Sequence, residues 1–408
     1  MERYFDENHL LIRDLVRDFA RNEIAPVAAE LDERSEFPWE NVRKMGELGL
    51  LGAPWSEELG GAGMDDISYI IIIHELAKVD ASHAITVSAH TTLGTSPIVN
   101  FGTDEQKHRF VPLLATGKVL GGFGLTEPGA GSDASGTQTT ARRVDGGYVL
   151  NGSKIFITHA GVGEIFVVTA VTEPDRGAHG ISSFIVTKPT ADLERAREVG
   201  IGHADALPYV EGVRAGKKEN KMGWCASDTR ELVMEDAFVP EENRLGAEGE
   251  GFTNFMQTLD SGRIGIAALS LGIAEGAFEQ ALAYSNQRRQ FGQRINEFQG
   301  IQFMLSDMAT GIEAARHLVY HAAWLKETGR PYHREAAMAK LFASELAMRT
   351  TTQAVQIHGG YGYMKEYPVE RMMRDAKICE IGEGTSEIQR LVIARSLLQE
   401  LDGRVADA

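Results

Sequence analysis

The chain has 408 residues, of which 43% are hydrophobic, and its formal net charge is −17. This length allows two or three domains, whereas the negative charge argues against nucleic-acid binding, which needs a basic face. No apolar run reaches the roughly 18 residues of a membrane helix, and the two cysteines, Cys225 and Cys379, cannot build a disulfide framework or a zinc site.

The N-terminal region, from Glu7 to about Gly122, has the spacing of amphipathic helices. Helix breaks are expected near Phe37-Pro38 and Leu59-Gly60-Gly61. The first residues are acidic and contain no apolar signal core, which predicts a cytoplasmic protein. The first helix is expected to bury one face, which is made by Leu10, Leu11, Leu15, Val16 and Phe19.

The region from Phe123 to Pro240 predicts β structure. A glycine- and hydroxyl-rich segment at 121–133 predicts a loop that either lines a phosphate or planar cofactor or only links two domains. Asn151-Gly152 predicts a hairpin turn followed by a strand, which is equally compatible with a plain edge strand. The expected strands are Tyr148–Leu150, Lys154–Thr158, Ile165–Val171, Ile181–Val186 and Glu231–Val239.

After Glu241 the pattern is helical again, with alanine-rich stretches at Ile264–Tyr284 and Glu335–Thr352 whose small side chains allow close packing. This pattern predicts a four-helix bundle. The fold class is therefore expected to be α+β, mainly α. Its three parts are an N-terminal helical domain (1–122), a middle β-barrel or sandwich domain (123–240) and a C-terminal four-helix bundle (241–408).

Two segments of the C-terminal region are candidates for ligand binding. Arg288-Arg289 stands before Phe291, a combination that suits a diphosphate and a stacked ring, although arginines at a helix end are also favoured by the helix dipole. The segment 356–363 places a glycine pair at a helix end, which is common and ambiguous by itself.

The most informative segment is Ile381–Arg390, in which Glu383 lies between two glycines just before a helix. Flanking glycines allow the backbone to approach a ligand closely. Ser386 and Gln389 have the spacing of a capping box. Taken alone, a glutamate in such a turn is more often solvated surface than a catalytic group.

Together these segments resemble the acyl-CoA dehydrogenase family of flavoproteins, most closely its short-chain, butyryl-CoA-like members. The motifs follow the family's order: LTEPGAGSD at 125–133, NGSKIFIT at 151–158, LDSGRIGIAA at 259–268, RRQFG at 288–292 and YPVERMMRDAKICEIGEGTSEIQR at 367–390. The resemblance implies FAD as the cofactor and oxidation of an acyl-CoA thioester to its 2-enoyl form. It also implies electron-transferring flavoprotein as the electron acceptor, and a homotetramer arranged as a pair of dimers.

The resemblance assigns roles to single residues. Glu383 matches the catalytic base, whereas some members carry their base at the position of Gly262, which cannot act as one. The thioester oxygen would be held by the backbone N–H of Glu383 and a flavin hydroxyl. Substrate contacts are implied for Ser132, Asp260, Arg263 and Gly384. Flavin contacts are implied for Phe123, Leu125, Thr126, Ser132, Phe156, Ile157, Thr158, Thr385, Ser386 and Glu387, and contacts to a neighbouring subunit's cofactor for Arg288, Gln290, Phe291, Gln299, Gln356, Gly359 and Gly360.

Three departures from the family pattern bear on the site. Phe156 stands where members often have tryptophan, so one stacking surface for the flavin is expected to be smaller. Gly382 stands where many have tyrosine, so one wall of the pocket is expected to be missing or supplied elsewhere. Residues 189–216 make a longer connection than usual, which predicts either an excursion near the CoA entrance or a surface feature without a catalytic role. The acyl pocket is expected among Ser82–Thr95 and Leu259–Ala268, and a short straight or branched chain is favoured.

Two other functions stay open on the sequence. A flavin oxidase on the same fold would return electrons to O2, although this chain is shorter than typical acyl-CoA oxidases and lacks their extra C-terminal domain. A non-enzymatic helical scaffold, or a DNA-associated relative of the fold, would be expected to lose the base or gain basic surface. Fatty-acid oxidation and amino-acid catabolism are both compatible with the motifs.

Overall fold

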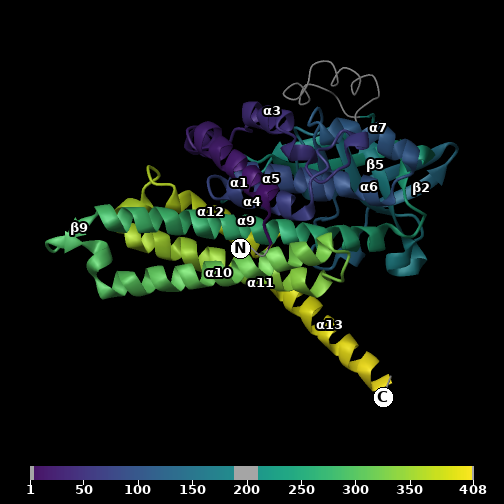
Figure 1. Ribbon diagram of the computed structural model, residues 1–408. Helices are drawn as coiled ribbons and strands as arrows, with labels where there is room; N and C mark the ends of the chain where they lie inside the picture. The colour runs from purple at the N-terminus through teal and green to yellow at the C-terminus, as the bar shows by residue number, and fades with distance from the viewer. Residues whose placement is uncertain (1–3, 188–209, 407–408) are drawn as a thin grey trace.

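The computed structural model describes residues 4–187 and 210–406, and Figure 1 shows helices from both ends of the chain beside a sheet from its middle. Residues 189–209 of the expected excursion at 189–216 therefore lie outside the described residues. The N-terminal helices are α1 (Glu7–Phe19), α2 (Ala28–Arg34), α3 (Trp39–Glu47), α4 (Asp66–Ala77), α5 (Ala81–Ser88), α6 (Ser96–Phe101) and α7 (Asp104–Ala115). The C-terminal helices are α9 (Gly251–Gln287), α10 (Gln299–Glu327), α11 (His333–His358), α12 (Val369–Cys379) and α13 (Ser386–Ala406).

The first helix corrects one expectation. Its N-terminus is closed by a capping box between Asp6 and His9, and Val16 and Phe19 are buried. Leu10, Leu11 and Leu15 are exposed instead, with Leu11 at 69%. The reason is geometric, because the buried stripe of α1 runs through positions 9, 16 and 19, and the predicted apolar face was wider than the surface that packs on α4.

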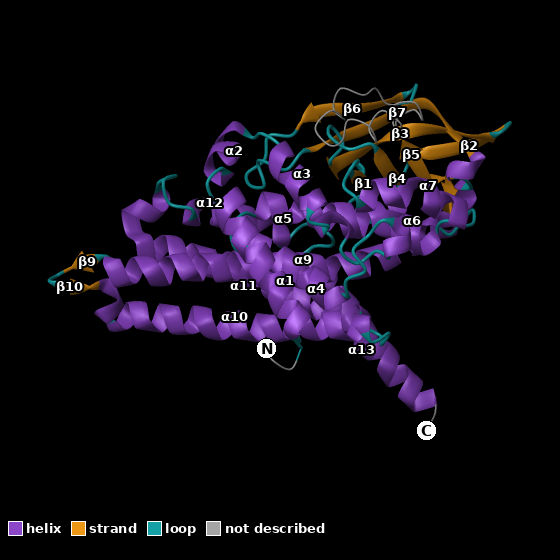
Figure 2. Cartoon of the chain, turned by 45° about the horizontal axis from the view of Figure 1, so that its top comes forward, coloured by secondary structure: helices purple, strands orange, loops and turns teal. Residues whose placement is uncertain are grey.

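The middle of the chain forms one eight-stranded sheet in the order β6-β7-β3-β2-β4-β5-β8, with β1 pairing in parallel with β4. Figure 2 shows these strands as a layer at one side of the helices. Their bounds are β1 (Gly121–Gly124), β2 (Thr140–Val144), β3 (Gly147–Thr158), β4 (Ile165–Val171), β5 (Ile181–Thr187), β6 (Val213–Lys218), β7 (Thr229–Pro240) and β8 (Arg244–Leu245); β9 (Arg289–Gln290) and β10 (Gln293–Arg294) form a separate hairpin.

Two turn predictions were wrong. The first part of the glycine-rich segment is strand β1 rather than loop, so the expected domain boundary at 122/123 falls inside a strand. Asn151-Gly152 is no hairpin turn, because it lies within β3, where the register with β7 shifts between Leu150 and Gly152 as in a β-bulge. The hairpin turn is Asp145-Gly146, between β2 and β3, and β3 is an inner strand.

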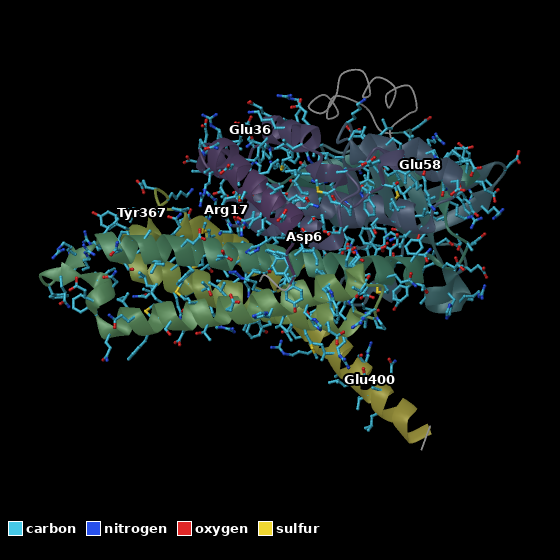
Figure 3. All side chains as sticks on the ribbon, viewed as in Figure 1. Asp6, Arg17, Glu36, Glu58, Tyr367 and Glu400 are labelled. Atoms are coloured by element: carbon cyan, nitrogen blue, oxygen red, sulfur yellow. The ribbon has the colours of Figure 1, made fainter. Side chains whose placement is uncertain are left out.

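The long helices α9, α10 and α11 pack with α12 into a bundle whose contacts are rich in buried alanine and glycine. Length and composition alone would also allow α9 to cross a membrane, and 67% of its most apolar window is buried inside the protein. Helix α13 leaves the body of the molecule at its C-terminal end in both Figure 1 and Figure 2. On its projecting part, Glu400 (Figure 3) pairs with Arg334 of α11 at 2.5 Å.

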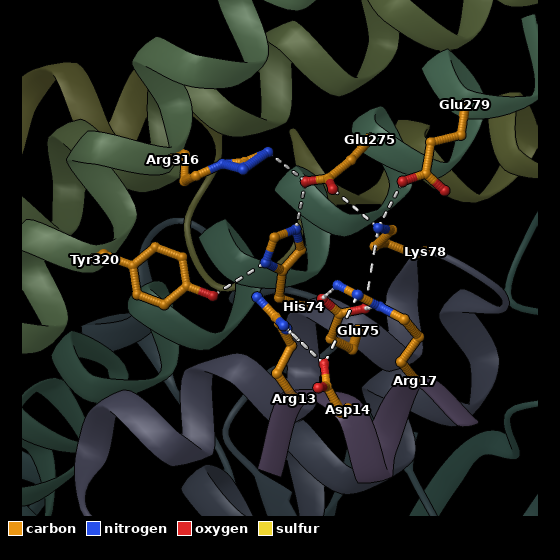
Figure 4. A network of polar contacts seen from close by, with 10 residues as sticks. All are labelled: Arg13, Asp14, Arg17, His74, Glu75, Lys78, Glu275, Glu279, Arg316 and Tyr320. Atoms are coloured by element: carbon orange, nitrogen blue, oxygen red, sulfur yellow. Dashed lines mark hydrogen bonds and ion pairs between the residues drawn. The ribbon is translucent and has the colours of Figure 1, made fainter. Parts of the chain in front are cut away.

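A charge cluster fastens the N-terminal helices to this bundle (Figure 4). Glu275 of α9 lies 3.0 Å from His74 Nε2, accepts from Lys78 Nζ at 2.9 Å, and accepts from Arg316 of α10 at 2.6 Å. Burial works to raise the pKa of Glu275, but these three partners hold it well below its usual range. The cluster fixes α4 against α9, and α9 carries residues of the site described next.

Candidate active site

The turn between α12 and α13 presents Glu383 in a strained backbone conformation. Glu383 has φ 54° and Gly384 has φ 92°, and a positive φ is uncommon for a residue with a side chain. Two buried donors hold the turn: Gln389 Nε2 donates to the carbonyls of Glu383 (3.2 Å) and Gly384 (2.9 Å), and Lys340 Nζ of α11 donates to Gly384 O at 2.7 Å. Strain retained in this way is typical of functional sites.

The cap of α13 differs from the predicted Ser386–Gln389 box. Thr385 Oγ1 accepts from the backbone N–H of Ile388 at 3.3 Å, so threonine is the capping residue. Ser386 is buried, and its hydroxyl has no hydrogen-bond partner among the described residues. Gln389 is fully buried and holds the glutamate turn instead of closing a capping box.

The carboxylate of Glu383 is placed against a glycine of α9. A Cβ atom built on Gly262 would lie 2.2 Å from Glu383 Oε2, so any larger residue here would displace the carboxylate from its present position. Oε2 is buried and has no hydrogen-bond partner in the described part of the chain. Burial raises the pKa of Glu383 to about 7, against the lowering effect of Lys340 and Arg263. A carboxylate poised near neutrality can accept a proton from a bound ligand.

Arg263 and Asp260 lie one turn apart on α9, next to this glutamate. Arg263 is buried and forms an ion pair with Asp260. Asp260 also pairs with Nδ1 of His333, the first residue of α11, at 2.7 Å. The Nε atom of Arg263 is buried without a partner among the described residues. Arg263 therefore provides a cation and an unpaired donor beside Glu383.

The hydroxyl-rich loop after β1 is organised by a buried acid that the sequence reading passed over. Glu127 accepts from Lys154 Nζ (2.6 Å), from Thr139 Oγ1 (2.6 Å) and from the backbone N–H of Gln138 (2.6 Å), and it also bonds Thr137. Burial works to raise the pKa of Glu127, but Lys154 and the two threonines lower it to about 2. The buried Glu127–Lys154 ion pair holds this loop to strand β3. The loop carries three of the predicted site residues, Leu125, Thr126 and Ser132.

Strand β3 offers an aromatic side chain beside that loop. Phe156 has φ 59° and is 64% exposed, whereas Ile157 packs in the sheet core and Thr158 is half-buried. Only the backbone of Ile157 is therefore available to a ligand. On strand β1, Phe123 stacks on Phe255 of α9 with ring centroids 4.0 Å apart. The backbone N–H of Ile155 donates to the Thr126 carbonyl at 2.8 Å, which places this part of β3 beside the loop, whereas Glu383 lies against Gly262 of α9.

The remaining predicted residues lie elsewhere. The hairpin β9–β10 and the segment after α11 lie at one end of the bundle, whereas α13 leaves at the other (Figure 1). They enclose an open hollow of about 550 Å³, where the Arg288 guanidinium lies 5.4 Å from the ring centre of Tyr361. Phe291 at the hairpin tip is 95% exposed. The hollow is lined by Tyr284, Arg288, Gln290, Ile295, Ile357, His358, Gly359, Gly360, Tyr361 and Met364.

Comparison with known proteins identifies the family. Models of the N-terminal, middle and C-terminal domains of acyl-CoA dehydrogenases match residues 6–118, 122–237 and 249–398. A short-chain specific acyl-CoA dehydrogenase of Clostridium acetobutylicum is 52% identical over 389 residues, 95% of this chain and 97% of that protein. The chain belongs to the acyl-CoA dehydrogenase family.

Two further relatives of this acyl-CoA dehydrogenase bear on its function. The structure of butyryl-CoA dehydrogenase from Megasphaera elsdenii matches with a TM-score of 0.90 and 48% identity over 97% of this chain and 99% of that one. Subunit CarC of the caffeyl-CoA reductase-Etf complex of Acetobacterium woodii is 44% identical over 97% of this chain and the whole of that protein. The predicted family and three-part fold are confirmed, and the chain is an FAD-dependent oxidoreductase.

The residues of this acyl-CoA dehydrogenase fit a flavin at the predicted place. A Cβ atom at Gly129 or Gly131 would meet nothing within 4 Å, so the loop surface is open, and Phe156 presents an exposed ring beside it. Sequence reasoning missed Lys340 and the Glu127–Lys154 pair. A signal for Lys340 was present, since a single lysine stands among the buried alanines of α11.

Proposed function

We propose that this acyl-CoA dehydrogenase oxidises a short straight-chain or branched acyl-CoA to the trans-2-enoyl-CoA, with Glu383 as the base that removes the α-proton. One observation carries the proposal: Oε2 of Glu383 is buried without a hydrogen-bond partner among the described residues and lies over Gly262, and the carboxyl has a pKa of about 7. A base with that pKa is ionised often enough at neutral pH to take a proton and strong enough to pull on a weak acid. Lys340 and Arg263 favour its charged form.

The loop of Phe123, Leu125, Thr126 and Ser132, together with Phe156, Ile157 and Thr158, would hold FAD, with Thr385, Ser386 and Glu387 on the adenosine side. When bound, FAD accepts the hydride that leaves the β-carbon. The backbone N–H of Glu383 would bind the thioester oxygen and strengthen its hold as negative charge develops there. Asp260, Arg263, Ser132 and Gly384 would bind the substrate.

The preference for a short chain rests on the relatives and on the local geometry. The curated relative from Clostridium acetobutylicum is named short-chain specific, and the solved relative from Megasphaera elsdenii is a butyryl-CoA dehydrogenase. Next to the base, a Cβ atom on Gly382 would meet only the Ile378 carbonyl, at 3.5 Å. That open wall supports a branched as well as a straight short chain.

The partners belong to the same proposal. The CarC relative is named as part of an Etf complex, which supports electron-transferring flavoprotein as the acceptor here. The hollow at the hairpin end is lined by Arg288, Gln290, Gly359 and Gly360, which supports binding of the cofactor of a second copy there. Phe291, Gln299 and Gln356 would add contacts outside this lining, in a homotetramer built from dimers. We place the enzyme in the cytoplasm.

An anaerobic titration tests the chemistry. The purified enzyme is mixed with butyryl-, isovaleryl- and octanoyl-CoA while the visible flavin band is followed. Bleaching by a short or branched thioester is expected, and Glu383→Gln should slow it by about 10²- to 10⁴-fold, the usual contribution of a general base. Glu380→Gln is the matched control, because Glu380 lies in the same turn but pairs with Lys377 at the surface. A flavin band that no thioester bleaches would refute the substrate class, and full activity in Glu383→Gln would refute the base.

A further inference from the structure

A hollow of about 430 Å³ lies apart from both groups of predicted site residues. It is formed where α1, α4 and α9 meet the start of α12, next to the charge cluster of Figure 4. None of the residues predicted to contact flavin or substrate is among its described lining. The proposed reaction therefore gives this hollow no role.

Cations outnumber carboxylates around the hollow. The described charged residues that line it are Arg17, Arg21, Lys78, Lys365, Arg371, Glu75, Glu279 and Glu366. The whole chain has the opposite balance, with 41 lysines and arginines against 58 acidic residues. A local excess of positive charge in a recess raises the concentration of anions there.

Two of the three acids are already paired with cations of the lining (Figure 4). Glu75 accepts from Arg17 Nε at 3.1 Å and from Arg17 Nη2 at 2.8 Å. Glu279 pairs with Lys78 Nζ at 2.7 Å, and Lys78 also donates to Glu275 at 2.9 Å. These two acids and two cations therefore offset one another, and the excess positive charge comes from the other lining residues.

Two of the other cations are exposed at the edge of the hollow. Arg21 and Lys365 are exposed, as is the third lining acid, Glu366. None of these three side chains forms an ion pair or hydrogen bond with a described residue. Both cations are therefore available to a ligand, and the single free carboxylate cannot offset them both.

The third cation, Arg371, is buried and only loosely held. It is 7% exposed. Its Nη2 donates to the Val79 carbonyl at 3.4 Å, and its Nε lies 3.5 Å from Asp80 Oδ1. Asp80 has a closer partner in His83, at 2.6 Å. Because charge-assisted hydrogen bonds of a guanidinium are usually about 2.7 to 2.9 Å long, Arg371 has donors that the described residues do not engage at normal length.

The start of α12 adds backbone donors to the same hollow. Pro368, which lines the hollow, is the N-cap of α12 and makes no side-chain capping hydrogen bond. The first N–H groups of a helix have no acceptor within the helix, and the helix dipole favours an anion at this end. Arg371 lies in the first turn of this helix, so a guanidinium and uncapped N–H groups are available together.

We propose that this hollow binds the phosphate group of a small phosphorylated metabolite, with Arg371 and the N-terminus of α12 beneath the phosphate and Arg21 and Lys365 at its edge. A guanidinium fork matches two phosphate oxygens. The volume exceeds that of a phosphate alone, and Ala29, Val79 and Met372 give the lining an apolar part for the rest of the ligand. The inference goes beyond the proposed function and does not depend on it.

Isothermal titration calorimetry on the FAD-loaded enzyme tests the site, with glucose 6-phosphate as the probe and glucose and inorganic phosphate as comparisons. Glucose 6-phosphate should bind saturably, one molecule per chain, whereas glucose should not bind. The Kd should rise about tenfold in Arg371→Gln and in Arg21→Gln/Lys365→Gln, because each change removes charge-assisted hydrogen bonds. Arg142→Gln is the matched control, since Arg142 is an exposed arginine of β2 outside the lining, and its Kd should stay at the wild-type value.

Each contrary result overturns the proposal. Wild-type enzyme that does not bind glucose 6-phosphate refutes the site, and a Kd that is the same in all variants shows that the phosphate binds elsewhere. Inorganic phosphate that binds as tightly as glucose 6-phosphate refutes the metabolite as ligand, because the rest of the hollow would then add nothing. Arg21 and Lys365 are exposed, so their double variant decides the outcome even if the buried Arg371→Gln change prevents folding.

Discussion

The contact between Glu383 and Gly262 shows how one missing side chain positions another residue's functional group. The carboxylate occupies the space in which a Cβ atom on α9 would lie, 2.2 Å from Oε2. The sequence motifs alone pointed to Glu383, but only the fold shows that its carboxylate fills the space beside Gly262. The pinning of the turn by Lys340 and Gln389 was equally invisible in the sequence, since it joins residues more than 40 positions apart through one carbonyl.

Gly262→Ala tests this contact directly. The new methyl group should push the carboxylate away from the substrate, and a displacement of about 1 Å can cost about 100-fold in kcat. Gly300→Ala on α10 is the control, because its Cβ atom would meet nothing within 4 Å. Steady-state rates and flavin content report the result. Wild-type kcat in Gly262→Ala would contradict the assigned position of the base.

The pH profile follows from the pKa of the same carboxylate. Burial raises it to about 7, and the base works only when it is deprotonated. The logarithm of kcat/KM should therefore rise with pH through about 7 and level off above it, because this profile reports the free enzyme. Lys340→Met removes a cation that lowers the pKa, so its midpoint should move to higher pH. A midpoint unchanged in Lys340→Met would show that this lysine does not act on the base.

Strand β3 and the loop after β1 show why the elements were only partly predictable. Alternation correctly located the β residues at 148–150 and 154–158, but the Asn-Gly pair between them forms a bulge, because β7 and β2 continue the ladder on both sides. The preference of Asn-Gly for a turn was therefore outweighed by hydrogen bonding to the neighbouring strand. The buried Lys154 was hidden for the same reason, since its partner Glu127 lies in another element.

The Glu127–Lys154 pair should be essential for the shape of the flavin loop. Lys154→Met would leave a buried, unpaired carboxylate and is expected to destabilise the protein by about 3 to 5 kcal/mol and to release flavin. Glu127→Gln/Lys154→Met should recover part of that loss, because no buried charge remains. Denaturant unfolding and flavin absorbance of the single and double variants measure the coupling. Strictly additive losses would show that the two residues do not act as a pair.

At the scale of the whole molecule, the predicted cofactor residues are divided between two places. Glu383 lies against Gly262 of α9 and the β1 loop is held to strand β3, whereas the hollow of Arg288 lies with the β9–β10 hairpin at the end of the bundle (Figure 1). The motifs predicted both groups, but a sequence carries no information on how far apart the fold will place them. We therefore propose that a flavin held by both groups takes one group from each of two copies of the chain.

Complementation between two inactive variants tests this sharing. Glu383→Gln lacks the base but keeps the hairpin, and Arg288→Ala/Phe291→Ala keeps the base but lacks the hairpin contacts. In a mixed dimer with two-fold symmetry, one of the two sites combines the intact base of one copy with the intact hairpin of the other. Random mixing makes about half of the dimers mixed, so about a quarter of wild-type activity should return. The control for the hairpin variant is Phe238→Asp, which changes an exposed aromatic residue on β7. This control variant should be active by itself. If each copy holds its own flavin completely, the mixture stays as inactive as its two components.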